Sequence, residues 1–386
     1  MTFTAPPWLE PRTAYVHVPF CGHHCGYCDF AVSAGQDELV DPYLDALSLE
    51  MQSLDRPRPV ETIFIGGGTP TYLHLPQLRR LLETINVWLP PTHDSHIEYS
   101  IESTPESLDA DKAALLHEFG VNRVSIGVQS FHQRTLSSLD RRHGVEQIAR
   151  SIETVRARIP TISLDLIFAA PGQTLADWDR DLEAALAFSP EHISTYGLTY
   201  EKGTPLWKRR ERGLLPIVGE NDELAMYERA IDRLESERYE HYEISNFARP
   251  GHRCRHNERY WANDAYYGFG VGAARYVDGL RELNIRDTSL YIRRVSAGES
   301  PTFQSERLPP RERAFETLAV QLRRSDGVDR GEFRVRTGFE LDDLIREPLA
   351  VFVGDGFLFD DGRRVKLTRR GRCLADGIIL HFMKSS

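Results

Sequence analysis

The first half of the chain alternates short runs of β-branched and aromatic residues with longer segments whose apolar residues recur at helical spacing. The short runs predict six strands and the longer segments predict helices between them. The expected strands are 15–18, 61–65, 97–101, 123–128, 163–168 and 192–198. The expected helices are 41–54, 76–89, 108–119, 148–158 and 175–188. Repeated β-α units indicate parallel strands with crossover helices, so we expect an α/β fold, a partial TIM-like (β/α)6 barrel.

The second half of the chain follows a different pattern. One further helix is expected at 222–237, after which residues 239–275 break the β-α rhythm and are rich in aromatics, Gly and His. Residues 296–305 have the composition of a linker, and helices are expected at 310–323 and 341–352. Asp361-Gly362 predicts a hairpin turn between 357–359 and 365–367, with a last helix from Thr368. We therefore expect a barrel core at 1–220, an extension at 221–300 and a small winged-helix-like α+β tail at 301–386.

Bulk composition narrows the function classes. The chain has 386 residues and a formal net charge of −10, whereas nucleic-acid binders are more often basic, so no nucleic-acid partner is expected. No apolar run approaches the ~20 residues of a transmembrane helix. Of the five cysteines, three are crowded and two, Cys254 and Cys373, are distant. That arrangement is not a disulfide framework and favours a reducing compartment, so we expect a cytoplasmic protein.

Cys21, Cys25 and Cys28 carry the most specific chemical signal. Three thiolates can hold three irons of a [4Fe–4S] cluster and leave the fourth iron open to an external ligand. The C-x3-C-x2-C spacing resembles that of the radical S-adenosylmethionine (SAM) superfamily, in which the amino and carboxylate groups of SAM take that iron. A zinc site is the alternative, with His23 or His24 as the fourth ligand.

Other polar residues fall at the ends of the expected strands, where the active sites of such folds lie. Gly66-Gly67-Gly68-Thr69 follows the second strand, and a glycine run allows close backbone approach to a ligand, here the amino end of SAM. Glu102, Gln129 and Asp165 suit ribose hydroxyls and an ammonium group. Arg141 suits a carboxylate.

Longer runs make the resemblance more specific. The chain resembles the coproporphyrinogen-oxidase branch of the radical SAM superfamily through the runs Tyr15-Val16-His17-Val18-Pro19-Phe20-Cys21, Gly66-Gly67-Gly68-Thr69-Pro70-Thr71, Gly127-Val128-Gln129-Ser130-Phe131, Asp165-Leu166-Ile167 and Pro171-Gly172-Gln173-Thr174. The resemblance implies a set of SAM contacts at Tyr15, Tyr27, Gly67, Gly68, Thr69, Glu102, Gln129, Arg141, Asp165 and Thr199. One departure is Thr104, where the family often has Asn.

Two subfamilies of this branch compete. The oxygen-independent coproporphyrinogen III oxidases have a fourth cysteine two residues beyond the third, where this chain has Phe30, so oxidase activity is not expected. The HemW-type haem chaperones have Phe there and a His-Asn-x-x-Tyr-Trp motif, matched here by His256, Asn257, Tyr260 and Trp261.

That resemblance implies haem handling by the motif, since His can ligate haem iron and aromatic side chains can cover a porphyrin. The residues alone equally fit a His-Asn pair in a core, and His252 and Cys254 are rival iron ligands.

The resulting hypothesis is a haem chaperone that binds haem, a [4Fe–4S] cluster and SAM. It would deliver haem to acceptor haemoproteins, with respiratory enzymes among those expected. The first alternative is the oxidase itself, a radical SAM decarboxylase. The second is a binding module that senses iron or SAM and acts through its C-terminal tail.

Overall fold

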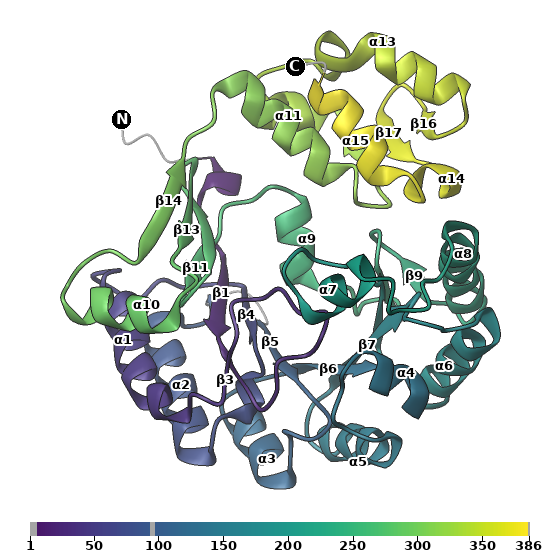
Figure 1. The fold of residues 1–386 in the computed structure, drawn as a ribbon. Helices are drawn as coiled ribbons and strands as arrows, with labels where there is room; N and C mark the ends of the chain where they lie inside the picture. The colour runs from purple at the N-terminus through teal and green to yellow at the C-terminus, as the bar shows by residue number, and fades with distance from the viewer. Residues whose placement is uncertain (1–5, 93–96, 385–386) are drawn as a thin grey trace, which may run out of the picture.

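A nine-stranded sheet forms the centre of the protein in the computed structural model, which describes residues 6–92 and 97–384 (Figure 1). Six parallel neighbouring strands follow chain order: β1 (Thr13–Val18), β4 (Thr62–Gly67), β5 (Glu98–Ser103), β6 (Arg123–Gln129), β7 (Thr161–Phe168) and β8 (His192–Gly197). Their register places Tyr15 beside Phe64 and Glu102 beside Ser125. The expected partial (β/α)6 barrel is confirmed, with strand ends shifted by at most two residues.

Helices connect these strands and cover the outer face of the sheet (Figure 1). They are α1 (Val40–Gln52), α2 (Leu75–Trp88), α3 (Ala110–Glu118), the short α4 (Gln133–Ser138), α5 (Val145–Arg156) and α6 (Leu175–Ala187). Local chemistry sets where they begin. The Asp109 carboxylate accepts a hydrogen bond from the Lys112 amide at the start of α3, and Thr174 caps α6 in the same way. Short 3-10 turns occupy Pro7–Leu9, Asp37–Leu39 and Pro70–Tyr72.

The segment that breaks the β-α rhythm covers both edges of the six-stranded core. After α7 (Pro205–Glu211) and α8 (Glu220–Ser236), strands β9 (Glu240–His241) and β10 (Asn246–Ala248) add antiparallel pairs beyond β8. On the other edge, β11 (Tyr267–Phe269) pairs in parallel with β1. Between them lies α9 (Arg255–Trp261), which carries the His-Asn-x-x-Tyr-Trp motif. Pairing both edges protects the sheet from unwanted strand addition.

The expected linker at 296–305 is wrong over its second half. A second, three-stranded sheet consists of β12 (Ala274–Val277), β13 (Leu280–Asn284) and β14 (Thr302–Glu306), with α10 (Thr288–Ser296) between the last two. The side chains of β14 are largely exposed, and those residues pair with β13 through their backbone. An exposed edge strand has the polar composition of a linker, which is why composition did not reveal it.

The C-terminal segment builds its own apolar core between Ala314 and Phe382. Its elements are α11 (Pro310–Gln321), β15 (Val328–Asp329), α12 (Arg330–Thr337), α13 (Leu341–Gly354), β16 (Leu358–Asp360), β17 (Arg364–Leu367), α14 (Arg369–Arg372) and α15 (Ala375–Lys384). β16 and β17 form the expected hairpin, whereas the expected last helix is broken between α14 and α15. The division at 220 and 300 stays a prediction, since the extension shares the main core through residues such as Phe247 and Tyr291.

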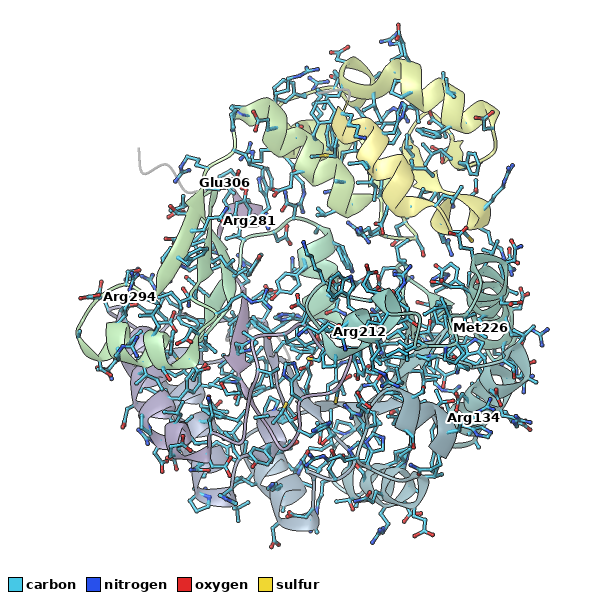
Figure 2. All side chains as sticks on the ribbon, viewed as in Figure 1. Arg134, Arg212, Met226, Arg281, Arg294 and Glu306 are labelled. Atoms are coloured by element: carbon cyan, nitrogen blue, oxygen red, sulfur yellow. The ribbon has the colours of Figure 1, made fainter. Side chains whose placement is uncertain are left out.

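The C-terminal elements pack onto the end of α9 (Figure 1). The Asn263 amide donates to Thr317 Oγ1 over 3.0 Å, and the Arg336 guanidinium pairs with Asp264 over 2.6 Å. Side chains fill the spaces that the ribbons leave between elements (Figure 2). None of the helices within 6–92 and 97–384 combines the length and apolar character needed to span a membrane.

Candidate functional site: a cysteine loop and two adjoining pockets

The cysteine loop is held above the end of β1 by two very short strands. β2 (Phe20–Cys21) and β3 (Ser33–Ala34) pair in parallel and bracket the loop. Within the loop the Cys28 amide donates to the Cys25 carbonyl over 3.2 Å. The loop therefore starts and ends on backbone hydrogen bonds, and its three thiols face the same pocket.

The three thiols have different surroundings. Cys21 is 9% exposed, its sulfur lies 3.2 Å from Thr69 Oγ1, and burial raises the pKa of the Cys21 thiol to about 12. The Arg141 guanidinium donates to Cys25 Sγ over 3.4 Å. Burial also raises the pKa of Cys28. Metal binding to these sulfurs would therefore release protons, and the Arg141 cation would stabilise the resulting thiolate charge.

The donor set fits an iron–sulfur cluster. Three cysteines facing one pocket beside a cation are the sulfur ligands that such clusters use. His24 Nε2 donates to the Cys28 carbonyl over 3.0 Å, so that nitrogen is engaged within the loop. Across the described ranges 6–92 and 97–384, no group of three or more His, Cys, Asp or Glu side chains is placed to hold a single metal ion; a cluster differs in that each cysteine sulfur binds its own iron.

The structure shows that the glycine run, expected to allow the approach of a ligand, allows close packing within the protein. A Cβ at Gly67 would lie 2.5 Å from the His17 ring, one at Gly66 would lie 2.9 Å from the Glu102 carboxylate, and one at Gly68 would lie 2.7 Å from the Pro19 backbone. The glycines thus admit neighbouring parts of the protein, and they fix the cysteine loop, β1 and β5 against each other. The pocket floor is built by this close packing.

Two buried carboxylates give the pocket its negative charge. Glu102 accepts from the Gly67 amide over 2.9 Å, and burial, followed by the nearby Asp165, raises the pKa of Glu102 to about 7. Asp165 accepts from Ser125 Oγ over 2.9 Å, and burial raises its pKa. Neither acid forms an ion pair with another described residue. A cationic ligand such as SAM, with its ammonium and sulfonium groups, fits this unbalanced pair.

Gln129 and Arg141 also line the pocket, and Gln129 ends β6, which lies between the strands of Glu102 and Asp165. The β6–β7 register shifts after Ile126, and Gln129 takes a left-handed φ of 66°, which turns it toward the pocket. The Arg141 guanidinium donates to the Gly127 carbonyl over 2.8 Å in addition to its contact with Cys25. Arg141 therefore spans from β6 to the cysteine loop.

His17 is a pocket residue that the sequence analysis did not single out. Its Nε2 donates to the Ala31 carbonyl over 2.9 Å, so Nδ1 accepts from the Tyr15 hydroxyl at 3.0 Å. Burial lowers the pKa of His17 to about 4, which keeps the ring neutral. His17 therefore orients Tyr15 and ties β1 to the segment after the cysteines. Its position two residues after Tyr15, on the same face of a strand, was the available signal.

All thirteen residues expected to hold the cluster or SAM line one pocket of about 990 Å³. They are Cys21, Cys25, Cys28, Tyr15, Tyr27, Gly67, Gly68, Thr69, Glu102, Gln129, Arg141, Asp165 and Thr199. Phe30 also lines it and is 66% exposed. Tyr196, near the end of β8, lines the same pocket and was not named in the sequence analysis. It lies on the same face of the strand as Ser194, two residues earlier.

The expected haem residues lie elsewhere, on and beside α9. His256 is 1% exposed, its Nδ1 is hydrogen-bonded to Thr62 Oγ1 at 3.1 Å, and its Nε2 is hydrogen-bonded to the Tyr260 hydroxyl at 2.9 Å. Burial lowers the pKa of His256 to about 3. Both ring nitrogens are thus occupied, and the ring packs against Phe64 with centroids 5.2 Å apart. In this arrangement His256 attaches α9 to β4.

The rest of the motif lines a second pocket of about 300 Å³. Asn257, Tyr260 and Trp261 form one side, and Arg323 of the C-terminal segment forms another. Tyr196 lines both this pocket and the larger one, so the two share a wall. Sequence reasoning missed Arg323, because no local pattern links it to a motif more than sixty residues away.

Cys254, a rival iron ligand on sequence grounds, is 3% exposed. Its thiol lies 3.5 Å from Glu98, and burial raises its pKa. A protonated buried thiol behaves as an inert apolar group. The structure therefore gives Cys254 a packing role beneath α9.

Comparisons with known proteins identify the families that the chain matches. The profile described as "Radical SAM superfamily" matches residues 15–185, and that described as "HemN C-terminal domain" matches 308–374. The coproporphyrinogen III oxidase HemN from Escherichia coli superposes with a TM-score of 0.85 over 98% of this chain and 91% of its own, at 23% identity, and so shares the fold.

Two curated relatives are similar over nearly the whole chain, and both carry the name "heme chaperone HemW". The Bacillus subtilis protein is 36% identical over 96% of this chain and 99% of its own. The Escherichia coli protein is 31% identical over 97% of this chain and 99% of its own. Fold and cysteine loop together define a radical SAM protein. Within that superfamily, the chain belongs to the HemW family.

Proposed function

We propose that this protein is a haem chaperone, which binds haem beside a [4Fe–4S]- and SAM-binding pocket and delivers it to acceptor haemoproteins in the cytoplasm. The observation that carries the proposal is the shared wall: Tyr196 lines both the cysteine pocket and the pocket formed by Asn257, Tyr260 and Trp261. The names of the full-length relatives support the same role.

In this proposal Cys21, Cys25 and Cys28 hold the cluster, and the open iron takes SAM. The chemistry that a bound cluster and SAM supply is one-electron chemistry. Glu102 and Asp165 bind the cationic and hydroxyl groups of SAM. Tyr15, Tyr27, Gly67, Gly68, Thr69, Gln129, Arg141 and Thr199 complete its contacts.

The haem site in this proposal is the exposed side of the motif. Tyr260 and Trp261 offer aromatic faces to the porphyrin, and Asn257 lies beside them. His256 contributes by holding α9 in place, since both of its nitrogens are engaged. For His256 to ligate iron, α9 would first have to move away from Thr62 and break the hydrogen bond between them.

The competing function is decarboxylation of coproporphyrinogen III. Phe30 stands where those oxidases have a cysteine, and its ring is exposed at the pocket mouth. Two assays on anaerobically reconstituted protein separate the functions. The first adds hemin, and the second adds reductant, SAM and coproporphyrinogen III. We expect a saturable Soret shift and no vinyl product by chromatography. Vinyl product formed in proportion to enzyme would overturn the proposal.

A further inference from the structure

The second pocket contains hydrogen-bonding groups that have no partner. Across the described part of the chain, nothing lies in reach of the buried indole N–H of Trp261, and the same holds for Oδ1 of Asn246, a residue only 4% exposed. A buried donor left without a partner costs about 1–3 kcal/mol. Both residues line the pocket, and a small shift of the half-buried Trp261 side chain would bring its N–H to a bound acceptor there.

Arg323 adds a cation to the Trp261 side of this pocket. Its guanidinium carbon lies 5.7 Å from the centre of the Trp261 ring, it forms an ion pair with Asp376, and its charge partly offsets the rise in the pKa of Glu243. The Asp376 side chain is 82% exposed, and exposed ion pairs contribute little. Arg323 can therefore exchange Asp376 for a ligand anion with little loss.

A carboxylate, that of Glu243, also lines the pocket. Glu243 is 2% exposed and accepts from the Asn246 amide group and, over 3.3 Å, from the Ser245 amide. Burial raises its pKa. A ligand carboxylate would be repelled by Glu243 and attracted by Arg323.

From this arrangement we infer that Trp261 Nε1 and Arg323 form a carboxylate-binding subsite for a haem propionate. The inference rests on the proposed haem-chaperone function and assigns part of the haem contact to the C-terminal segment. At about 300 Å³ the pocket is at the lower limit for small-molecule sites, so it receives one propionate arm while the macrocycle lies outside against Tyr260 and Trp261. Charge-assisted hydrogen bonds from arginine suit a carboxylate.

The test compares hemin with hemin dimethyl ester, in which both propionates are esterified. Each is titrated into the reconstituted full chain and followed by its Soret band. Wild-type protein should bind hemin at least five-fold more tightly than the ester. Arg323→Gln should reduce that preference below two-fold while retaining most of the affinity for the ester. Trp261→Phe should also reduce the preference below two-fold, and it should lower the affinity for the ester as well, because the Trp261 ring contacts the macrocycle.

Asp376→Asn is the matched control with the opposite sign. It removes an exposed competitor for Arg323, so the preference for hemin should increase about two-fold or more, and an exposed substitution leaves the core intact. Equal wild-type affinity for hemin and its ester would overturn the inference and leave the proposed function standing. A preference unchanged in Arg323→Gln would also overturn it. Binding of neither porphyrin would overturn the proposed function itself, and the subsite with it.

Discussion

The Tyr260 hydroxyl lies 2.9 Å from Nε2 of His256, the nitrogen through which a histidine would ligate iron if Nδ1 stayed with Thr62. The motif that resembles a haem-binding sequence therefore uses its histidine to attach α9 to the barrel. His256 can act as an iron ligand or as an anchor for α9, and the two roles predict different behaviour for variants at this position.

His256→Gln should keep the haem spectrum of the wild type, because an amide can retain one of the two hydrogen bonds. His256→Ala should lower the free energy of unfolding by about 2–4 kcal/mol, through a cavity beside Phe64 and the loss of the Tyr260 hydroxyl's partner, while Thr62 keeps its bond to Thr13. Resonance Raman or magnetic circular dichroism of the haem complex, with thermal unfolding, checks both. Loss of a low-spin iron signal in His256→Gln, with unchanged stability, would identify His256 as the ligand.

Glu102 should make both SAM affinity and stability depend on pH. Its pKa in the folded protein is raised from 4.5 to about 7, so the folded state holds the proton more tightly than the unfolded chain does. Its contribution to stability is therefore complete below pH 4.5 and is lost as pH rises toward 7, by up to about 3 kcal/mol. The cation of SAM needs the ionised form, so SAM affinity should rise between pH 6 and 8.

Glu102→Gln should flatten both pH dependences and weaken SAM at pH 8. Calorimetric titration with SAM and chemical unfolding, each at pH 6, 7 and 8, supply the measurements. SAM affinity that rises with pH equally in the variant would assign the dependence to another group, of which Asp165 is the nearest acid.

Gly67→Ala should be far more damaging than Gly203→Ala. Both glycines have positive φ, 111° and 98°, so each substitution introduces backbone strain of about 1–3 kcal/mol. Only at Gly67 would the new Cβ meet a side chain, the His17 ring at 2.5 Å, whereas nothing lies within 4 Å at Gly203. We expect the first variant to lose at least about 2 kcal/mol more than the second, measured by urea unfolding. Equal losses would mean that the glycine run does not pack as described.

Asp181 should control SAM affinity from outside the pocket. It is fully buried and accepts from the Ser130 hydroxyl and the Phe131 amide, immediately after Gln129. These bonds hold the turn that points Gln129 into the pocket. Asp181→Asn should therefore reduce SAM affinity about ten-fold, measured by equilibrium dialysis, while the protein stays folded.

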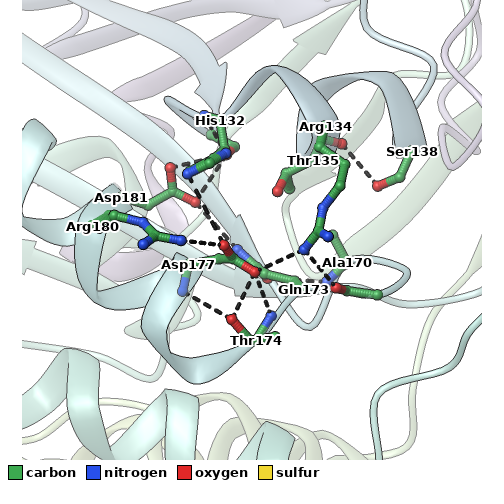
Figure 3. Close-up of polar contacts among 12 residues, drawn as sticks. His132, Arg134, Thr135, Ser138, Ala170, Gln173, Thr174, Asp177, Arg180 and Asp181 are labelled. Atoms are coloured by element: carbon green, nitrogen blue, oxygen red, sulfur yellow. Dashed lines mark hydrogen bonds and ion pairs between the residues drawn. The ribbon is translucent and has the colours of Figure 1, made fainter.

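The control for Asp181 is Asp177, four residues earlier on the same helix. Asp177 accepts from Thr174 at the start of α6 and pairs with Arg134, Arg180 and, over 4.0 Å, His132 (Figure 3). Asp177→Asn should lower stability by about 1 kcal/mol and change SAM affinity less than two-fold. Similar losses of SAM affinity in both variants would point to a general loosening of α6.

Local sequence patterns were sufficient for the barrel and for the first pocket. Strand periodicity places side chains two residues apart on one face, and the carboxyl ends of parallel strands meet at one edge, so Glu102, Gln129 and Asp165 were expected together and line one pocket. The cysteine spacing is equally local.

Strand periodicity and residue spacing could not predict contacts between segments far apart in the sequence. The bond from His256 to Thr62 joins residues 194 positions apart, and no spacing rule relates them. The contact of Arg323 with Trp261 depends on how the C-terminal segment docks on α9. β14 escaped detection because its side chains are exposed and only its backbone pairs. In each case the contact joins segments that are distant in the sequence, so composition and local spacing cannot predict it.

Haem transfer from the reconstituted protein to an apo-haemoprotein tests the central claim most directly. Haem-loaded protein, with cluster and SAM, is mixed with apomyoglobin, and the acceptor's Soret band is followed over time. We expect transfer to go to completion. We also expect a Cys28→Ser variant, loaded with the same amount of haem, to transfer it more slowly. Retention of haem by the protein, or identical transfer rates with and without an intact cysteine loop, would contradict it.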